Sequence, residues 1–586
     1  MTVVLDKDLP GAPDLDGRPV VTAGAQQRKG DRVGLVVAAL VVVFGIGFVP
    51  IFNIPSWTIR MALLPLVAAA GLPWLPTVRR SGQRLAVSAA SAFAVIALVT
   101  AVVSPRPLVG LTGDYGWGTG AIFVAGLVGI WALGASSSPG WSRHIQTALL
   151  AVASLNAVVA LAQLAIPDIL PALEVDGGRA PGLTGNPVHL AALLMGAVAL
   201  CASRASTRTA WWAGGAALLT AAAQLTGSRF VLVVVVIVAV AQFRPNGVKT
   251  GSMVAAALLA GVLAGTALAS GPVGSAVSSA DRVGTRGVAI RLDIWGAGGQ
   301  AVAANPLGHG PGQFRDAVAP YGTPEIAAAL APNELPADAH NIVIEYAVTT
   351  GLAGVMALML WIGAALFAAR GPLAWFALAL LGFHLVQPQS VITTPLLFLA
   401  LGAAAATLKR DERRPLSRRV ASALLLVVAG AAAAAFVVGD YHLHRARLDF
   451  DRSSAVTAER LIGHWAQPAH ELGKIEVFEA ITSKSYDFDS ALGWLTSAAA
   501  SDPGDPSSWV ALGMLELADG RHVEASIHLN EALRTYPWWM PALMGMAEVE
   551  AAQGHHSEAL MWAERAAAVR ATPEALALVE RLRSSG

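Results

Sequence analysis

The sequence predicts an all-α protein, in which a polytopic bundle of membrane-spanning helices is followed by a soluble helical domain. Of its 586 residues, 55% are hydrophobic and only 13% are charged, about half the charged share of a typical soluble domain. Apolar runs near the membrane-spanning length of about 20 residues recur from Val33 to Val438. From Asp440 the composition turns polar, and residue types begin to recur at a fixed interval.

Charge and cysteine content exclude several classes of function. The net charge is +1, so no overall basic field points to nucleic acid as a partner. The single cysteine, Cys201, rules out an internal disulfide and makes a cysteine-based metal site very improbable. Residues 1–32 are polar and lack the charged-then-apolar order of a cleaved signal peptide. We expect them to form a disordered cytoplasmic tail.

Hydropathy predicts twelve to thirteen transmembrane helices. The segment 59–77 contains three prolines, so its helix is expected to break. The predicted spans are 33–50, 59–77, 85–103, 118–135, 144–166, 188–203, 210–227, 230–243, 252–270, 342–368, 372–386, 391–407 and 420–438.

The distribution of basic residues predicts the orientation of these spans, because short cytoplasmic loops carry an excess of Lys and Arg. The basic residues of alternate turns fall on one side: Arg28, Lys29, Arg32, Arg79, Arg80, Arg84, Arg143, Arg204, Arg208, Arg244, Lys249, Arg370 and the block at 409–419. We therefore expect a multi-pass protein of the cytoplasmic (inner) membrane with its N-terminus inside. A transmembrane domain at 33–408 would carry an outer loop at 271–340. A cytoplasmic basic linker and the last span would follow at 409–439, and an extracytoplasmic domain at 440–586.

The C-terminal region repeats with a period of 34 residues. Pro503 and Pro537 are separated by this interval, as are Gly520 and Gly554. The stretch 509–533 resembles a tetratricopeptide repeat, whose period is about 34 residues. Two interpretations remain open: a helical cap that packs on the membrane domain, or a concave surface that docks a protein partner or the acceptor. The acidic DFD triplets at 449–451 and 487–489 are interpreted as exposed helix surface.

Three arginines break the charge pattern, because the predicted topology puts them on the outer side. Arg229 lies in a turn with almost no length, so its guanidinium must sit near the membrane interface. Arg179 and Arg291 lie in outer segments that return to the membrane. A guanidinium fork suits two phosphate oxygens at once, so together they would suit a lipid-linked diphosphate. The alternative is pairing with the nearby carboxylates of Glu174, Asp176 or Asp293.

A polar cluster, Asp338–Ala339–His340–Asn341, opens the span at 342–368. Asn341 can cap the helix, and Asp338 and Glu345 suit its dipole. His340 has no such structural reason to be there and is a candidate general base. His309, in the glycine- and proline-rich stretch 306–314, can equally be a loop histidine bonded to backbone.

The order and spacing of these motifs resemble the O-antigen ligase/polymerase superfamily of polyprenyl-diphosphate glycan transferases, over roughly residues 30–408. The last span and the repeats are additions to that plan. The residues that carry the resemblance are Ser228, Arg229, Arg291, Trp295, Pro306, Gly308, Gly310, Phe314, His340, Asn341, Glu345, Gly351 and Gly354.

The resemblance implies a GT-C-type fold and a glycan donor carried on an undecaprenyl-type diphosphate. Arg229 and Arg291 would hold the diphosphate, with Arg179 a weaker third, and His340 would activate the acceptor hydroxyl. The acceptor would be a glycan, a lipid or a protein, in contact with membrane lipids. No cofactor is expected, and no metal, since the first outer loop at 50–58 lacks acidic residues. Supporting roles are expected for Ser228, Trp295, His309, Gln313, Asn341, Glu345, Asn186 and His189.

Three other functions remain open at this stage. A polysaccharide polymerase would use the same site with a second lipid-linked glycan as acceptor. A transporter or flippase would place charged residues at mid-membrane depth, whereas here they gather at the outer edge. A non-catalytic scaffold would be built around the repeats.

Overall fold

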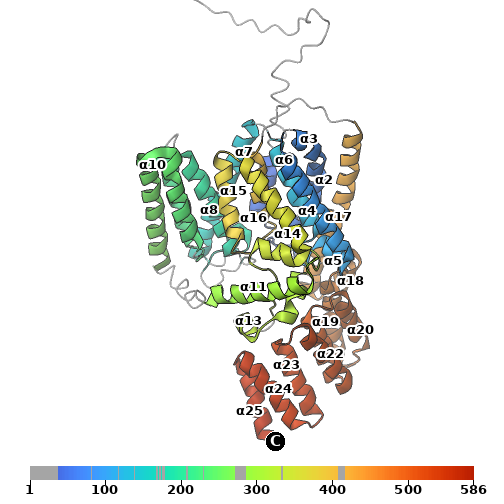
Figure 1. The fold of residues 1–586 in the computed structure, drawn as a ribbon. Coiled ribbons are helices and arrows are strands. Elements are labelled where there is room, and N and C mark those ends of the chain that lie inside the picture. Colours follow the sequence, from blue (N-terminus) through green and yellow to red (C-terminus); the bar gives the residue numbers. More distant parts are fainter. Residues whose placement is uncertain are drawn as a thin grey trace, which may run out of the picture.

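The structure, a computed structural model, describes residues 37–585 apart from 81, 117, 138, 167–168, 171–172, 174–178, 206–208, 229, 271–285, 331–333 and 407–415. The predicted tail at 1–32, Arg229, Glu174 and Asp176 therefore lie outside the described residues. In the described part of the chain every regular element is a helix, which confirms the all-α fold class. Figure 1 shows a bundle, α11 lying across one end of it, and the helices α18–α25 beyond that end.

Each of the thirteen predicted spans overlaps a helix. Within the described residues, seven helices are long and apolar enough to cross a membrane. The long α10 covers two predicted spans. The bundle consists of the helix Val37–Ile46, α2 (Thr58–Gly71), α3 (Leu75–Arg80), α4 (Arg84–Val103), α5 (Pro107–Thr112), α6 (Ala121–Ala135), α7 (Pro139–Ala165), α8 (Pro187–Arg204), α9 (Thr209–Gln224), α10 (Phe230–Ser270), α14 (Ile342–Ala368), α15 (Pro372–His384), α16 (Thr393–Ala404) and α17 (Leu416–Asp449).

The proline-rich span is broken, as its sequence predicts. A 3₁₀ turn, η1 (Leu72–Trp74), separates α2 from α3. Gly71, the last residue of α2, packs so closely on α6 that an added Cβ would lie 2.1 Å from the carbonyl oxygen of Gly129. Small residues that let two backbones approach are typical of helix pairs in membranes.

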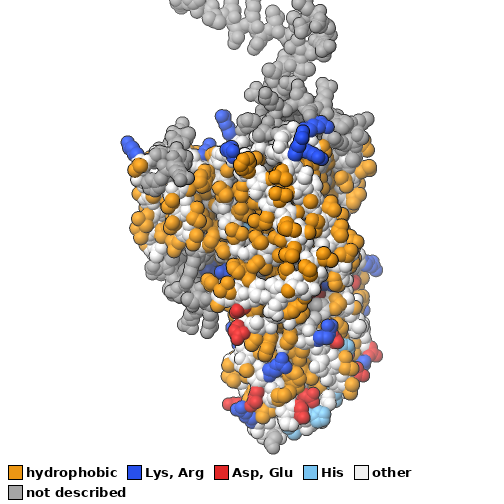
Figure 2. Space-filling view, viewed as in Figure 1, with side chains coloured by type: hydrophobic (Ala, Val, Ile, Leu, Met, Phe, Trp, Pro, Cys, Tyr) orange, Lys and Arg blue, Asp and Glu red, His pale blue; other side chains and the backbone are white. Residues whose placement is uncertain are grey.

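Aromatic rings fill the centre of the bundle and fix α14. The ring centroids of Trp361 and Phe398 stack at 4.4 Å, and Trp131 packs edge-on to Trp361 at 5.6 Å. Figure 2 shows hydrophobic side chains covering the sides of the bundle, with Lys and Arg gathered at the end away from α18–α25. This arrangement is that of a multi-pass membrane protein.

The predicted outer loop contains α11 (Arg286–Ala304), α12 (Phe314–Val318), η5 (Ala319–Tyr321) and α13 (Pro324–Ala329). Phe314 and Val318 share a buried apolar cluster with Ile294 of α11 and Ala339. The segment after α11 binds α14 through its backbone: His309 N–H donates to Val348 O at 3.0 Å and Gly310 N–H to Thr349 O at 2.8 Å. α14 is kinked at this contact, at Gly351.

The repeat helices are α18 (Arg452–Ile462), α19 (Ala466–Thr482), α20 (Asp489–Ser501), α21 (Pro506–Ala518), α22 (His522–Thr535), α23 (Met540–Ala552), α24 (His556–Val569) and α25 (Pro573–Ser585). The bounds of α23 and α24 follow those of α21 and α22 at the 34-residue interval read from the sequence. Gly513 lets α21 and α22 approach, since an added Cβ would lie 2.9 Å from Leu529 Cγ. α21 and α22 therefore pack closely at this glycine.

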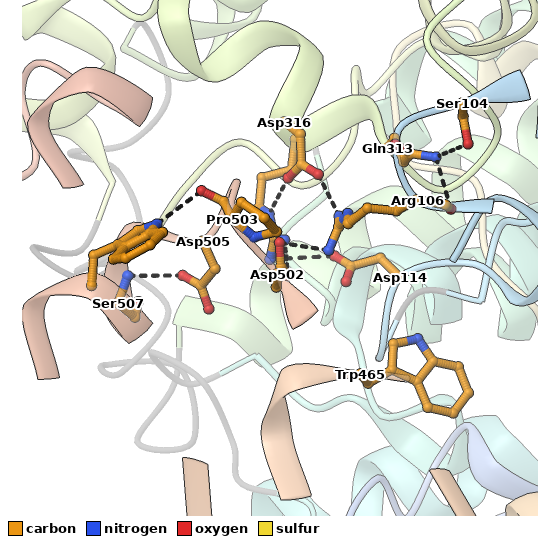
Figure 3. Close-up of polar contacts among 12 residues, drawn as sticks. Ser104, Arg106, Asp114, Gln313, Asp316, Trp465, Asp502, Pro503, Asp505 and Ser507 are labelled. Atoms are coloured by element: carbon orange, nitrogen blue, oxygen red, sulfur yellow. Dashed lines mark hydrogen bonds and ion pairs between the residues drawn. The ribbon is translucent and has the colours of Figure 1, made fainter. Parts of the chain in front are cut away.

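Five charged residues join the repeat helices to α12, in the predicted outer loop, and to the bundle (Figure 3). Arg315 on α12 binds Asp502 (2.5 Å), Asp316 (3.1 Å) and Asp114 (3.5 Å). Arg106, from the bundle, binds Asp502 at 2.5 Å and also pairs with Asp316. Burial alone would raise the pKa of the Asp502 carboxyl, but Arg315 and Arg106 outweigh it and hold that pKa below its usual value. We call these five residues the ionic junction.

Candidate functional site

His340 occupies a strained backbone position just before α14. Its φ is +52°, in the left-handed region that non-glycine residues seldom adopt. Such strain costs on the order of 1–3 kcal/mol and persists only where the surroundings enforce it. His340 is therefore held by its neighbours in one backbone conformation.

Three side chains hold the residues on either side of His340. Asn341 caps α14 as predicted, since its Oδ1 accepts from the N–H groups of Val343 (2.8 Å) and Ile344 (3.2 Å). The indole N–H of Trp295 donates to Ala339 O at 2.8 Å, and Ala339 N–H donates to Glu345 Oε2 at 3.1 Å. Trp295 and Glu345 thus fix both peptide groups of Ala339.

The His340 side chain is one-third exposed, at 34%. Its Nδ1 lies 3.2 Å from the carbonyl oxygen of Asp338. Because a carbonyl only accepts, Nδ1 carries the proton of the neutral ring, and Nε2 keeps its lone pair. Burial is the main cause that lowers the pKa of His340, to about 4, and the charge of Arg291 lowers it further. The imidazole is therefore neutral near pH 7 and can accept a proton.

Arg291 on α11 lies close enough to His340 to influence it electrostatically. Its Nη2 donates to Gln387 Oε1 at 3.2 Å, and its Nε is buried and has no hydrogen-bond partner in the part of the chain that the structure describes. Among the described residues no carboxylate, Asp293 included, forms an ion pair with Arg291. A partly buried cation that lacks a carboxylate is suited to an anionic ligand.

Arg179 lies close to the turn between α9 and α10. The Cδ of Arg179 would lie 2.8 Å from a Cβ added to Gly227. The next residue, Ser228, has a buried Oγ that lacks a hydrogen-bond partner among the described residues. Phe230 packs edge-on to Phe383, with ring centroids 4.8 Å apart, which places this turn beside the end of α15.

His189 lies in the first turn of α8. Asn186 caps that helix through its Oδ1, which accepts from Val188 N–H at 2.8 Å. The His189 side chain is buried, and its Nε2 has no hydrogen-bond partner among the described residues. His340 and Arg60 are close enough to act on it electrostatically. His189 thus adds an uncommitted polar atom to the interior side of the site.

Two of the expected supporting residues make hydrogen bonds that hold the segment after α11. The His309 ring lies 3.1 Å from Ala301 O, which fits the loop-histidine alternative. Gln313 Nε2 donates to Ser104 Oγ at 2.7 Å, next to the ionic junction (Figure 3). Among the described residues, neither side chain forms a hydrogen bond or ion pair with His340.

Sequence reasoning missed two residues near the site. Arg60 is fully buried on α2 and donates to the carbonyl oxygens of Phe44, Ser56 and Leu183. In the sequence, the feature that could have indicated it is a single charge within an apolar run. Gln387, which binds Arg291, lies in the polar turn between two apolar helices, and only its polarity could have indicated it.

The described residues contain no group of three or more His, Cys, Asp and Glu side chains that could hold a metal ion. His340 can accept a proton, and Arg291 can bind an anion.

Comparison with known proteins gives two partial matches. A 95-residue segment is 38% identical to "Protein CTR9 homolog" of Arabidopsis thaliana; the match covers 16% of this chain and 8% of that protein. The family model described as O-Antigen ligase matches residues 190–359, less than a third of the chain. That stretch includes Arg291, Trp295 and His340. The match supports a membrane protein of the glycan ligase or polymerase type.

Proposed function

We propose that this protein is a membrane glycosyltransferase of the O-antigen ligase type. It moves a glycan from a polyprenyl diphosphate carrier to an acceptor hydroxyl at the outer face of the cytoplasmic membrane. The acceptor is a glycan, a lipid or a protein. The observation that carries the proposal is that a strained, neutral His340 lies within electrostatic reach of Arg291, a cation that no described carboxylate neutralises.

His340 acts as the general base. Its Nε2 accepts the proton of the acceptor hydroxyl as that oxygen attacks the anomeric carbon of the glycan. Asp338 keeps the other ring proton on Nδ1 through its carbonyl oxygen. Trp295 and Glu345 hold the preceding peptide, so the ring keeps its position during the reaction.

Arg291 stabilises the leaving group. As the bond from the anomeric carbon to the phosphate oxygen breaks, its electron pair stays on the diphosphate. Fixed cations there favour the transition state over the ground state. Arg229 is proposed as the second diphosphate ligand and Arg179 as a weaker third. Displacement in one step inverts the anomeric centre and needs no metal.

A polysaccharide polymerase remains the second candidate, because the same residues could serve a lipid-linked acceptor glycan. A product whose chain lengthens would indicate the polymerase, and one whose anchor changes would indicate the ligase. A transporter fits less well. Two of the buried charges, Arg60 and Glu345, lie in the first turns of α2 and α14 rather than at mid-helix.

The test uses the purified full chain in lipid nanodiscs with a polyprenyl-diphosphate-linked glycan and candidate acceptors. Wild-type protein should release polyprenyl diphosphate and glycosylate an acceptor. His340→Ala should lower the rate by about 10²–10⁴-fold, the usual contribution of a general base. The matched control is His556→Ala, an exposed histidine of α24, which should keep the wild-type rate.

Two results would count against the proposal. Normal transfer by His340→Ala would remove the base from the mechanism. Strong inhibition by EDTA that added metal reverses would overturn the metal-independent route.

A further inference from the structure

The turn between α15 and α16 contacts the arginine of the proposed site and Asn341, the residue next to its histidine. α15 ends at His384 and α16 begins at Thr393. This turn lies beyond residues 190–359, the part that the family model matches.

On the arginine side, the contact is made by Gln387. Its Oε1 accepts from Arg291 Nη2 at 3.2 Å, and the side chain is 8% exposed. On the histidine side, Leu385 O accepts from Asn341 Nδ2 at 2.9 Å. The turn therefore joins α11 to the segment that presents His340.

The turn is rigid enough to set this spacing. Ser390 Oγ lies 2.9 Å from Thr393 Oγ1 and accepts from Thr393 N–H at 3.1 Å. Ser390 N–H donates to Thr394 Oγ1 at 3.0 Å. All three side chains are fully buried, so these bonds are shielded from competing water.

The neutral amide of Gln387 orients the guanidinium without cancelling its charge. A carboxylate at this position would pair with Arg291 and compete with the phosphate oxygens for the same donors. An amide oxygen accepts one N–H and leaves the net positive charge to the ligand. A glutamine at position 387 therefore orients Arg291 and leaves its positive charge available to bind an anionic ligand.

We infer that Gln387 is a positioning residue for the donor diphosphate: it orients Arg291, and the α15–α16 turn sets the spacing between Arg291 and His340. This inference rests on the proposed function, since it presupposes that Arg291 binds the diphosphate.

The test measures binding to the full chain in nanodiscs of undecaprenyl diphosphate and of the uncharged alcohol undecaprenol. Gln387→Glu should weaken undecaprenyl diphosphate binding by about tenfold or more, and Gln387→Leu by about threefold. Undecaprenol binding should not change in either variant. Gln387→Leu removes the hydrogen bond without adding charge, so it keeps the test valid if Gln387→Glu does not fold.

Two further variants separate the possible failures. Gln83→Leu is the matched control: Gln83 is also 8% exposed and donates to Ala405 O, far from the site in sequence. It should bind both lipids as wild type does. If Arg291→Ala weakens diphosphate binding but the folded Gln387 variants do not, the positioning role is wrong and the proposed function stands. Equal weakening of both lipids by the Gln387 variants also overturns the role, because it shows a structural effect. If Arg291→Ala binds as wild type does, the diphosphate site itself lies elsewhere.

Discussion

At the scale of single residues, the proposed mechanism depends on His340. Its strained backbone and the hydrogen bond of its ring both hold the imidazole in one position. The residue adopts φ +52° while the ring donates from Nδ1 toward Asp338. The sequence alone identified His340 by elimination, since capping and the helix dipole explained its polar neighbours. Sequence could not reveal the strain, because the strain depends on Trp295 and Glu345 holding Ala339 from two different helices.

The pH dependence of transfer tests the state of His340. Burial lowers the pKa of this imidazole from 6.5 to about 4, so the ring stays neutral and basic as pH falls through 6. We expect kcat at saturating donor to hold at pH 5.5 and to decline only as pH approaches the lowered pKa. Rates measured across pH 4–8 in nanodiscs check this, and an acid limb at or above pH 6.5 would contradict it.

Arg291 should tolerate lysine poorly. Lysine keeps the charge but lacks the planar fork that binds two phosphate oxygens and Gln387 together. Arg291→Lys is expected to lower kcat/KM for the donor by about tenfold, or ~1.4 kcal/mol in transition-state binding. Arg581→Lys, on the exposed surface of α25, is the control. Full activity in Arg291→Lys would show that the fork is not used.

At the scale of elements, the loop after α11 and the kink in α14 form one interlocked unit. Gly351 has φ +72° and ψ −179°, a region that is essentially restricted to glycine. Its neighbour in space is the backbone of Leu307, which an added Cβ would approach to 2.4 Å. The glycines of the two motifs were visible in the sequence, but their mutual contact was not, since it joins segments about forty residues apart.

Gly351→Ala should therefore destabilise the protein by about 2–4 kcal/mol through backbone strain and overpacking. Gly363→Ala is the matched control in the same helix, because an added Cβ there meets nothing within 4 Å. The melting temperatures of the two variants are measured in detergent, with the loss of monodisperse protein on heating as the readout. Equal melting temperatures for the two variants would show that the kink is not required.

At the scale of the whole molecule, the local patterns of the sequence predicted part of the fold. The hydropathy runs located the long helices of the bundle, and the 34-residue interval located α21–α24, but neither pattern indicated α11, α12 or α13. The ionic junction was not foreseen, since Arg106, Arg315 and Asp502 lie in three distant segments.

The ionic junction should determine how firmly the repeat helices are attached. Removing Arg315 takes the ion-pair partner from the buried Asp114 and leaves Asp316 and Asp502 with Arg106 alone. Breaking a buried ion pair typically costs about 3–5 kcal/mol. Arg315→Gln should speed hydrogen exchange in α12 and around Asp502. Arg521→Gln, which breaks only exposed ion pairs, should not. Unchanged exchange in Arg315→Gln would mean that apolar contacts alone hold the two parts together.

The central claim is that one diphosphate site lies between Arg291 and His340. A cryo-EM structure of the full chain in a nanodisc with undecaprenyl diphosphate tests it most directly. The account predicts phosphate oxygens within hydrogen-bond distance of Arg291, with the free Nε2 of His340 facing the outer phosphate. A diphosphate bound elsewhere on the bundle, without contact to Arg291, would contradict it.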